Sequence, residues 1–384
     1  MKKIVFDVDD VLPHLSVVSN VVNTKNVIPV LDCVAIQTSP KDEEDGRVEM
    51  RMAASDGDMW LRGRCYVYGE TDKGVSLCVD AKSLTQALSN LGGERVVMSI
   101  DEKKKTITCK YSTGYFSLPF VSADEFPAPS KQEDGDTSVK VIEGKLLAAI
   151  ERVKFAVASD KVFVVLNSVH LDFLKDGMIS AATDKRIIAV YKDITSSNGE
   201  SIKNGLTLPK KACGLLTSIL DGKSVSNATI TYNDRNATIK TDLYSLTTRL
   251  MEYNYPAYTN VIPKDNDIFV EINKDAMAMA LKRMSSVVGS SDLVELTFNK
   301  NNLNMTSNDV DFNRSTSEDV ICVYDGELFK ICLSFGCMVS ILSSLDGENI
   351  TMSLKSARTP VIFKESVQNE NYKYLACLMP MQML

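Results

Sequence analysis

The sequence predicts an α+β fold made of three tandem copies of one domain, each with two helices packed on antiparallel sheet. Three observations predict it. An amphipathic helix, a second helix followed by a β-hairpin, and a closing step into proline each occur three times, at intervals of about 125 to 135 residues in a chain of 384. Such regular recurrence indicates a repeated structural unit, and the chain is long enough for each copy to have its own core.

The first helix of each copy carries an apolar stripe with +4, +3, +4 spacing, which is typical of an amphipathic helix. The stripe residues are Val11, Leu15, Val18 and Val22, then Leu146, Ile150, Val153 and Val157, then Met277, Leu281, Met284 and Val288. One such stripe is unremarkable. Three of them at nearly constant offset indicate a triplicated unit.

The second helix of each copy ends in leucine and two turn residues, and the last glycine is expected to supply a left-handed C-cap. These ends are Leu91-Gly92-Gly93, Leu220-Asp221-Gly222 and Leu345-Asp346-Gly347. An alternating apolar and polar segment follows each one, which predicts a β-hairpin. The expected hairpin tips are Glu102 to Lys105, Asn233 to Asn236 and Ser356 to Arg358.

Each copy closes with a residue followed by proline, at Phe126-Pro127, Tyr255-Pro256 and Met379-Pro380. The polar stretch over residues 130–138 is then expected to be a linker. These landmarks predict domains over residues 1–129, 130–259 and 260–384.

The composition indicates a soluble, unexported protein without a cofactor. The chain has a net charge of −7, with 44% hydrophobic and 24% charged residues, and it contains neither a long apolar run nor a signal-peptide pattern. Its nine cysteines are scattered and none forms a C-x-x-C pair, which favours free thiols in a reducing cytoplasm over a disulfide framework or zinc site. The overall negative charge argues against a surface that grips nucleic acid everywhere, but it allows a local basic face.

The opening stretch KKIVFDVDDVL raises an enzymatic alternative. Asp7 and Asp9 follow an apolar run with the spacing of the first motif of haloacid dehalogenase phosphatases, in which the first aspartate attacks phosphorus and the second transfers the proton. That fold requires a doubly wound parallel sheet, which the repeat pattern does not predict. In the repeat alignment all three copies have a strand-to-helix junction here, so Asp9 and Asp10 are expected to cap the first helix.

Four further segments resemble the bacterial sliding clamp family, the beta subunits of DNA polymerase III. They are NVIPVLDCVAI (26–36), AATDKRIIAVY (181–191), NYPAYTNVIPK (254–264) and the ending LMPMQML. They occur in the family's order along the whole chain. The sequence departs from the family at Lys185-Arg186-Ile187, where the family has Gly-His-Arg, and at Asn260 and Gln382, where it has basic residues.

The resemblance implies a homodimer in which six similar domains close into a ring around duplex DNA, with helices inside and sheets outside. Such a ring has no catalytic site. It is a processivity factor that tethers DNA polymerase III, through its alpha subunit, together with the clamp loader and other proteins that carry a short clamp-binding motif. DNA contacts are expected to be independent of sequence, because the chain has no base-reading motif.

Three sets of residues are expected to carry these roles. Basic residues on or near the helices would face DNA: Lys25, Lys82, Lys145, Arg152, Lys154, Lys210, Lys211, Lys274, Lys282 and Arg283. The resemblance implies a partner-peptide cleft formed by Leu166, Thr183, Arg186, Ile188, Pro256, Val261, Pro360, Leu378, Met379, Pro380 and Met381. It also implies that Phe116 and Leu118 of one chain meet Val287 and Val288 of the other.

A second non-enzymatic hypothesis remains open, in which the chain is an interaction scaffold with no role on DNA. The two hypotheses differ in one property. A ring should remain on circular DNA and slide off linear DNA, whereas a scaffold should show no such dependence on topology.

Overall fold

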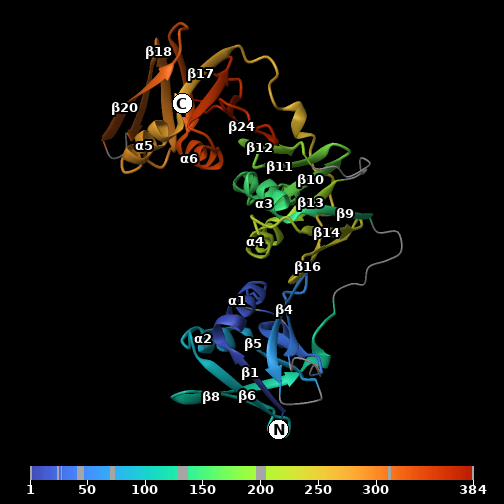
Figure 1. Ribbon diagram of the computed structural model, residues 1–384. Coiled ribbons are helices and arrows are strands. Elements are labelled where there is room, and N and C mark those ends of the chain that lie inside the picture. Colours follow the sequence, from blue (N-terminus) through green and yellow to red (C-terminus); the bar gives the residue numbers. More distant parts are fainter. Residues whose placement is uncertain are drawn as a thin grey trace. The chain divides into compact units, whose positions relative to one another are not determined.

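The computed structural model describes residues 2–23, 26, 28–40, 47–69, 74–128, 137–195, 205–309 and 313–382. These residues form two compact units, one of residues 1–144 and 214–250 and the other of residues 145–213 and 251–384. Each unit contains one twelve-stranded antiparallel sheet (Figure 1). The prediction of antiparallel α+β architecture is confirmed.

Unit 1 contains all the strands of the first repeat and four strands of the second. In order across the sheet they are β1 (Lys2–Asp7), β6 (Arg95–Asp101), β7 (Thr106–Tyr111), β8 (Gly114–Ser122), β5 (Ser76–Asp80), β2 (Cys33–Thr38), β3 (Arg47–Ser55), β4 (Met59–Gly69), β16 (Tyr244–Arg249), β15 (Asn236–Lys240), β14 (Asn227–Tyr232) and β9 (Thr137–Ile142). The repeats are joined by β4 and β16, which pair from Met59 with Thr248 to Gly63 with Tyr244.

Unit 2 contains the other half of the second repeat and the whole third repeat. Its sheet runs β13 (Leu206–Pro209), β10 (Ser168–Leu174), β11 (Gly177–Thr183), β12 (Ile187–Asp193), β24 (Tyr372–Leu378), β23 (Val361–Glu365), β22 (Asn349–Leu354), β17 (Ile268–Asn273), β20 (Arg314–Val323), β19 (Asn302–Asp309), β18 (Leu293–Asn299) and β21 (Phe329–Ser334). Here β12 and β24 join the repeats, in the same way as β4 and β16.

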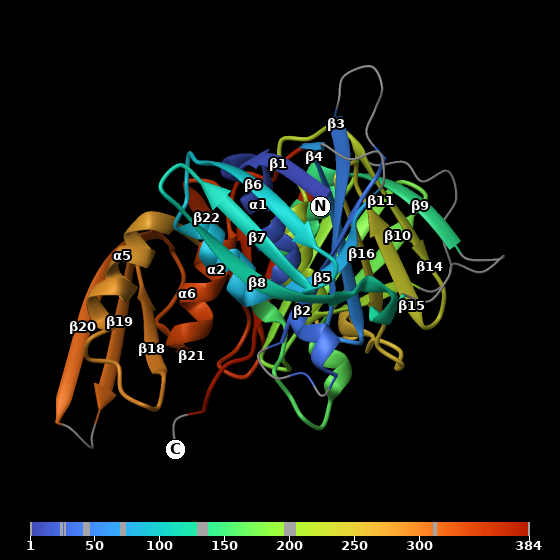
Figure 2. The ribbon, with the colours of Figure 1, turned by 90° about the horizontal axis from the view of Figure 1, so that it is seen from below.

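Two helices belong to each repeat, as predicted. They are α1 (Val8–Ser19) and α2 (Ala81–Ser89), α3 (Glu143–Glu151) and α4 (Lys210–Ile219), and α5 (Lys274–Met284) and α6 (Phe335–Ser344). Five short 3-10 helices lie between strands: η1 (Pro29–Asp32), η2 (Ala123–Glu125), η3 (Lys154–Ala156), η4 (Val164–Leu166) and η5 (Tyr258–Asn260). In unit 1, α1 packs on α2 and on β3 and β4. In unit 2, α5 lies beside α6 and against β17 and β20 (Figures 1 and 2).

The apolar stripes form the buried faces of these helices, although the helices are shorter than predicted. Val8, Val11, Leu15 and Val18 are the buried residues of α1, which ends at Ser19 and therefore excludes Val22. The other two stripes also extend beyond their helices. Val153 and Val157 follow α3, which ends at Glu151, and Val288 follows α5, which ends at Met284. Serines and valines follow α5 immediately, and both types favour helix less than alanine or leucine does.

The hairpins are confirmed, but the expected glycine caps are only partly correct. Pairs β6–β7, β14–β15 and β22–β23 form at the predicted positions. Gly93 and Gly347 have φ of +75° and +83°, yet they lie in turns beyond helices that end at Ser89 and Ser344. Gly222 is absent from the described glycines with positive φ. The glycines thus shape the turn into the hairpin rather than the helix end itself.

Two methionines of α5 provide a matched test of the stripe. Met277 is completely buried and Met279 is 61% exposed on the same helix. Met277→Ala should lower the free energy of unfolding by about 2–5 kcal/mol, because it removes buried contacts and leaves a cavity. Met279→Ala should change it by less than about 0.5 kcal/mol. Urea denaturation of both variants measures the difference, and equal midpoints would contradict the assignment of the core face.

Candidate DNA-facing and partner-binding surfaces

Three of the helix-borne lysines are exposed. Lys82 on α2 and Lys282 on α5 make no ion pair with any described residue. Lys210 is the first residue of α4, and its Nζ donates to Ser159 Oγ at 3.0 Å. Lys211 beside it is half-buried, and Lys25 lies outside the described residues. The charges of Lys82, Lys210 and Lys282 are thus available to an anionic partner.

Four other candidate cations already contact neighbouring groups. Lys145 Nζ donates to Thr195 Oγ1 at 2.6 Å, Lys154 Nζ lies 3.8 Å from Glu151, Lys274 Nζ donates to the Leu345 carbonyl at 3.3 Å, and Arg283 Nη2 lies 2.6 Å from Glu318 Oε2. An exposed pair such as Arg283 with Glu318 is weak and can exchange partners. These four remain candidates, but each would have to leave or share its present contact to bind phosphate.

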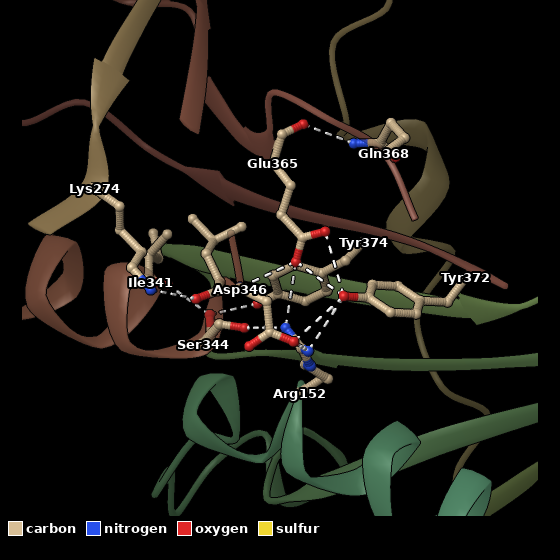
Figure 3. Close-up of polar contacts among 10 residues, drawn as sticks. Arg152, Lys274, Ile341, Ser344, Asp346, Glu365, Gln368, Tyr372 and Tyr374 are labelled. Atoms are coloured by element: carbon tan, nitrogen blue, oxygen red, sulfur yellow. Dashed lines mark hydrogen bonds and ion pairs between the residues drawn. The ribbon is translucent and has the colours of Figure 1, made fainter. Parts of the chain in front are cut away.

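Arg152 requires a correction, because its side chain points into unit 2 and is only 16% exposed (Figure 3). Its guanidinium pairs with Asp346 and donates to the Ser344 carbonyl at 2.7 Å and to Glu365 Oε1 at 3.5 Å. The rings of Tyr372 and Tyr374 also lie against it, with centroids 5.2 and 5.7 Å from Cζ. Arg152 therefore fastens the end of α3 to the third repeat, and we exclude it from the DNA-facing set.

Glu365 depends on this arginine. Its side chain is buried, and burial raises the pKa of the Glu365 carboxyl, whereas Arg152 and the Tyr372 hydroxyl act in the opposite direction. Glu365 also accepts the backbone N–H of Asp346 at 3.0 Å. A buried carboxylate without its cation is costly. Arg152 therefore stabilises the charged form of Glu365, which accepts a hydrogen bond from the turn after α6.

The carboxyl-terminal segment is held by its backbone while its side chains remain partly open. After β24, the Met379 N–H donates to the Arg186 carbonyl at 2.8 Å, and the Met381 N–H donates to the Cys332 carbonyl at 2.8 Å. Met379 is 38% exposed, and Pro380 and Met381 are half-buried. The segment thus runs from the β12–β24 junction to β21 and presents apolar side chains along the way.

The expected cleft residues all lie in unit 2 and divide into a buried and an exposed group. Leu166, Thr183, Ile188 and Leu378 are buried, Pro360 is half-buried, and Arg186, Pro256 and Val261 are exposed. Ile188 belongs to a cluster with Ala181, Tyr258 and Cys377, against which Val190, Tyr255 and Ile262 pack. Buried residues of this set can form a floor and exposed ones a rim.

One exposed apolar segment beside these residues was missed from the sequence. Val162, Phe163 and Val164 are 80%, 53% and 45% exposed. Lys185 Nζ lies 3.6 Å from the centroid of the Phe163 ring and 2.7 Å from Asp160 Oδ2. The hydrogen bond from Lys185 lowers the pKa of Asp160 to about 2. The run of apolar residues after Asp160 was the available signal.

Lys185 is a position at which this sequence departs from the family pattern. By the resemblance it stands in the place of a glycine, and its φ is +79°, in the left-handed region that favours glycine. The Thr183 Oγ1 accepts the Lys185 N–H at 3.1 Å, and Asp184 Oδ1 accepts the next two N–H groups at 2.8 and 2.7 Å. These bonds hold the turn in the conformation that a glycine would adopt at lower cost.

The expected dimer residues lie at open positions of both units. Phe116 and Leu118 are half-buried on β8, and residues Gly114–Pro119 of that strand pair only with β7 among the described strands. Val287 and Val288 are half-buried just beyond α5, where both N–H groups donate to the Met284 carbonyl. The half of β8 that carries Phe116 and Leu118 therefore has an open backbone edge among the described strands.

The opening aspartates do not form the expected helix cap. Asp7 is the N-cap residue of α1 without a side-chain bond to the helix, and Asp9 and Asp10 lie in its first turn. Asp9 Oδ1 instead accepts the Gly93 N–H at 3.1 Å and so connects α1 to the turn after α2. Capping by Asp9 was therefore wrong, although negative charge in a first turn still suits the helix dipole.

Neither sheet has the doubly wound parallel order that the phosphotransferase alternative requires. Within the described part of the chain, no group of three or more His, Cys, Asp or Glu side chains is arranged to hold a metal ion. The same residues contain no helix long and apolar enough to cross a membrane. All nine cysteines are free thiols, and burial raises the pKa of those at 65, 109 and 377 to about 12.

Individual relatives share the fold at low sequence identity. The chain is 23% identical to the beta sliding clamp of Synechococcus elongatus over 364 residues, which cover 94% of each chain. It is 24% identical to that of Synechocystis over 380 residues, covering 94% and 95%. A solved sliding clamp from Bartonella birtlesii, with griselimycin bound, matches with a TM-score of 0.88 at 22% identity over the full length of both chains. The beta subunit from Thermotoga maritima matches with a TM-score of 0.87 at 20% identity, also over both full chains.

Family models account for nearly the whole sequence. The N-terminal, central and C-terminal domains of the DNA polymerase III beta subunit match residues 2–130, 140–257 and 259–382 in turn. The three repeats therefore correspond to three tandem clamp domains. The chain belongs to the DNA polymerase III beta subunit family, the bacterial DNA sliding clamps.

Proposed function

We propose that two copies of this chain close head to tail into a six-domain ring that encircles duplex DNA and tethers partner proteins to it. The chain would act as an accessory subunit of the replicative polymerase in the cytoplasm, with no catalytic site of its own. Its partners would be the polymerase III alpha subunit, the clamp loader and other proteins with a clamp-binding motif. Family membership supports the role, and the arrangement of strands supports the closure.

The proposal rests on a strand pairing that joins consecutive repeats at two places. A third pairing of the same kind would need a second copy of the chain. Strand β4 of the first repeat pairs with β16 of the second, and β12 of the second pairs with β24 of the third. The backbone bonds also correspond, since the Arg249 N–H donates to the Asp58 carbonyl and the Met379 N–H to the Arg186 carbonyl. By this pattern β20 of the third repeat and β8 of the first are the equivalent strands that remain.

Both remaining strands have open backbone edges. Residues Gly114–Pro119 of β8 pair only with β7, and residues Ser315–Ile321 of β20 pair only with β19, within the described part of the chain. An open strand edge is a template for pairing with another chain. Joining β20 of one copy to β8 of another would continue the pattern, and two such junctions would close a ring.

The helix-borne lysines would face the enclosed DNA. Phosphate contacts from Lys82, Lys210, Lys211 and Lys282 would be independent of base sequence. With a net charge of −7, the rest of the chain would not hold DNA tightly. Weak, local attraction is what a sliding ring needs, because each contact must break as the ring moves.

The carboxyl-terminal segment would form part of the partner-peptide cleft. Met379 lies at the β12–β24 junction and Met381 beside β21, both with partly exposed side chains, and flexible methionines can adapt to different partners. Two apolar anchors of a bound peptide would contribute about 1.5–3 kcal/mol each. Ordering the peptide offsets much of this, so single-motif affinity should be micromolar, and tethering on DNA would raise the effective concentration.

The ring itself can be tested with Phe116→Ala combined with Val288→Asp. The unmodified protein should sediment at twice the chain mass, stay on nicked circular plasmid once loaded, and leave when the plasmid is linearised. The double variant should sediment as monomers and lose this retention, because it removes an apolar anchor and places a charge in the interface. Val225→Asp is the control, since Val225 is 86% exposed in a turn of the second repeat. A double variant that remains dimeric would place the interface elsewhere.

The DNA face can be tested with Lys210→Glu and Lys211→Glu together. The pair should weaken retention on DNA of any sequence, and the dependence of the binding constant on salt should become shallower because fewer counterions are released. Circular dichroism should show an unchanged fold. Lys300→Glu, at an exposed turn between β18 and β19, is the charge-matched control. An unaltered salt dependence in the pair would remove these lysines from the DNA face.

The cleft can be tested by deleting Met379 to Leu384. The shortened chain should remain folded and dimeric, because β24 ends at Leu378. It should lose binding of a Gln-x-x-Leu-Phe peptide and the ability to support processive synthesis. Peptide affinity is measured by fluorescence anisotropy and assembly by sedimentation. Peptide binding that survives the deletion would show that the segment does not form the cleft.

A further inference from the structure

Unit 1 contains a cleft of about 640 Å³ at the junction of the first and second repeats. It lies on the outward face of β2, β3 and β4, opposite the face on which α1 packs. The turn between β15 and β16 forms one wall and the Phe126-Pro127 segment forms another. The Trp60 Nε1 donates to the Pro127 carbonyl at 3.2 Å and holds that second wall in place. This volume is within the range of ligand sites.

One row of residues across the sheet has smaller side chains at its two ends than the equivalent row of unit 2. Ala35 pairs with Ala53, Ala53 with Arg62, and Arg62 with Ser245. The equivalent row of unit 2 is His170, Ala181, Val190 and Leu375. There the His170 ring stacks on Tyr255 with centroids 5.0 Å apart, and Tyr258 packs on Ala181. Ala35 replaces the imidazole in unit 1. It is buried in a small cluster with Cys78 and Ala123, against which Ala53 and Phe126 pack, and the cleft opens beside these residues.

The floor of the cleft is apolar and its rim is mainly cationic. The half-buried residues Ala53, Phe126 and Pro127 form the floor together with the buried Ala35 and Ala123, and Arg51, Arg62, Arg64 and Lys240 stand around it with Glu49 and Asp242. Glu49 pairs with Arg51 at 2.6 Å and lies 3.7 Å from Arg64. Arg62 and Lys240 are exposed and make no ion pair with any described residue. Among the described residues, the rim therefore has two positive charges without an ion pair, on a chain whose net charge is −7.

We propose that this cleft docks a short acidic peptide segment of a partner protein, with one apolar side chain on the alanine floor and carboxylates against Arg62 and Lys240. It would be a second docking site, separate from the carboxyl-terminal segment. Charge complementarity selects the acidic flanks, and the floor selects an apolar anchor. Nucleic acid fits less well, because the floor offers one aromatic ring where base stacking needs several.

The proposal can be tested with a fluorescein-labelled peptide that has a Phe-Leu pair flanked by three aspartates on each side and no Gln-x-x-Leu-Phe motif. Full-length protein should bind it, and a peptide with lysines in place of the aspartates should not bind. Arg62→Glu should weaken binding at least tenfold by reversing a rim charge. Ala35→His should do the same by filling the floor as His170 does in unit 2. Lys300→Glu and deletion of Met379 to Leu384 should leave the affinity unchanged.

Each contrary result overturns the proposal. Absence of binding would exclude an acidic-peptide site, and binding unaffected by Arg62→Glu and Ala35→His would place the peptide elsewhere. Loss of binding on deletion of Met379 to Leu384 would assign the peptide to the carboxyl-terminal segment. Competition by a duplex oligonucleotide would identify a nucleic-acid site, and a change in sedimentation with Arg62→Glu would identify a second copy of the chain as the occupant. Arg62 is exposed, so its variant tests the cleft even if Ala35→His fails to fold.

Discussion

The backbone pairing between the last strand of one repeat and the fourth strand of the repeat before it is the constraint on which the rest of the structure depends. It occurs at β4–β16 and at β12–β24 and merges separate sheets into two sheets of twelve strands. Backbone bonds carry both strand pairings, and at the β12–β24 junction the Arg152 side chain adds an ionic contact between the repeats. The carboxyl-terminal segment lies beside the β12–β24 junction, and the cleft of unit 1 lies beside the β4–β16 junction.

The two junctions share a backbone pattern but differ in what surrounds it. In unit 2 the row across the sheet is filled by His170 and tyrosines, and Arg152 adds a buried ionic contact between repeats. In unit 1 the same row is Ala35, Ala53, Arg62 and Ser245, and the space stays open. A repeated backbone therefore supports two different surfaces, and substitution at one row changes what each surface can bind.

The positively charged residues illustrate why the sequence alone cannot define a DNA-binding face. Arg152 follows the last residue of α3, and Lys210 is the first residue of α4. Arg152 forms ion pairs with Asp346 and Glu365, which are about 200 positions further along the chain. Its charge is therefore not available to an outside anion. Lys210 remains exposed, and its Nζ donates to Ser159 Oγ. Pairing with a distant carboxylate decides which cation stays available, and only the folded chain brings the two together.

The sequence by itself determined the repeat, the two helices of each copy, the three hairpins and the relationship to the sliding clamps. Those features depend on local periodicity, turn chemistry and short motifs, and each can be recognised within a few dozen residues. Only the tertiary structure decided where the helices end and what Asp9 and Arg152 contact. It also decided the open halves of β8 and β20 and the cleft beside Ala35. Their causes lie in residues far apart in sequence, such as Asp9 with Gly93 or Ala35 with Arg62 and Ser245, whose proximity is created by strand pairing and packing.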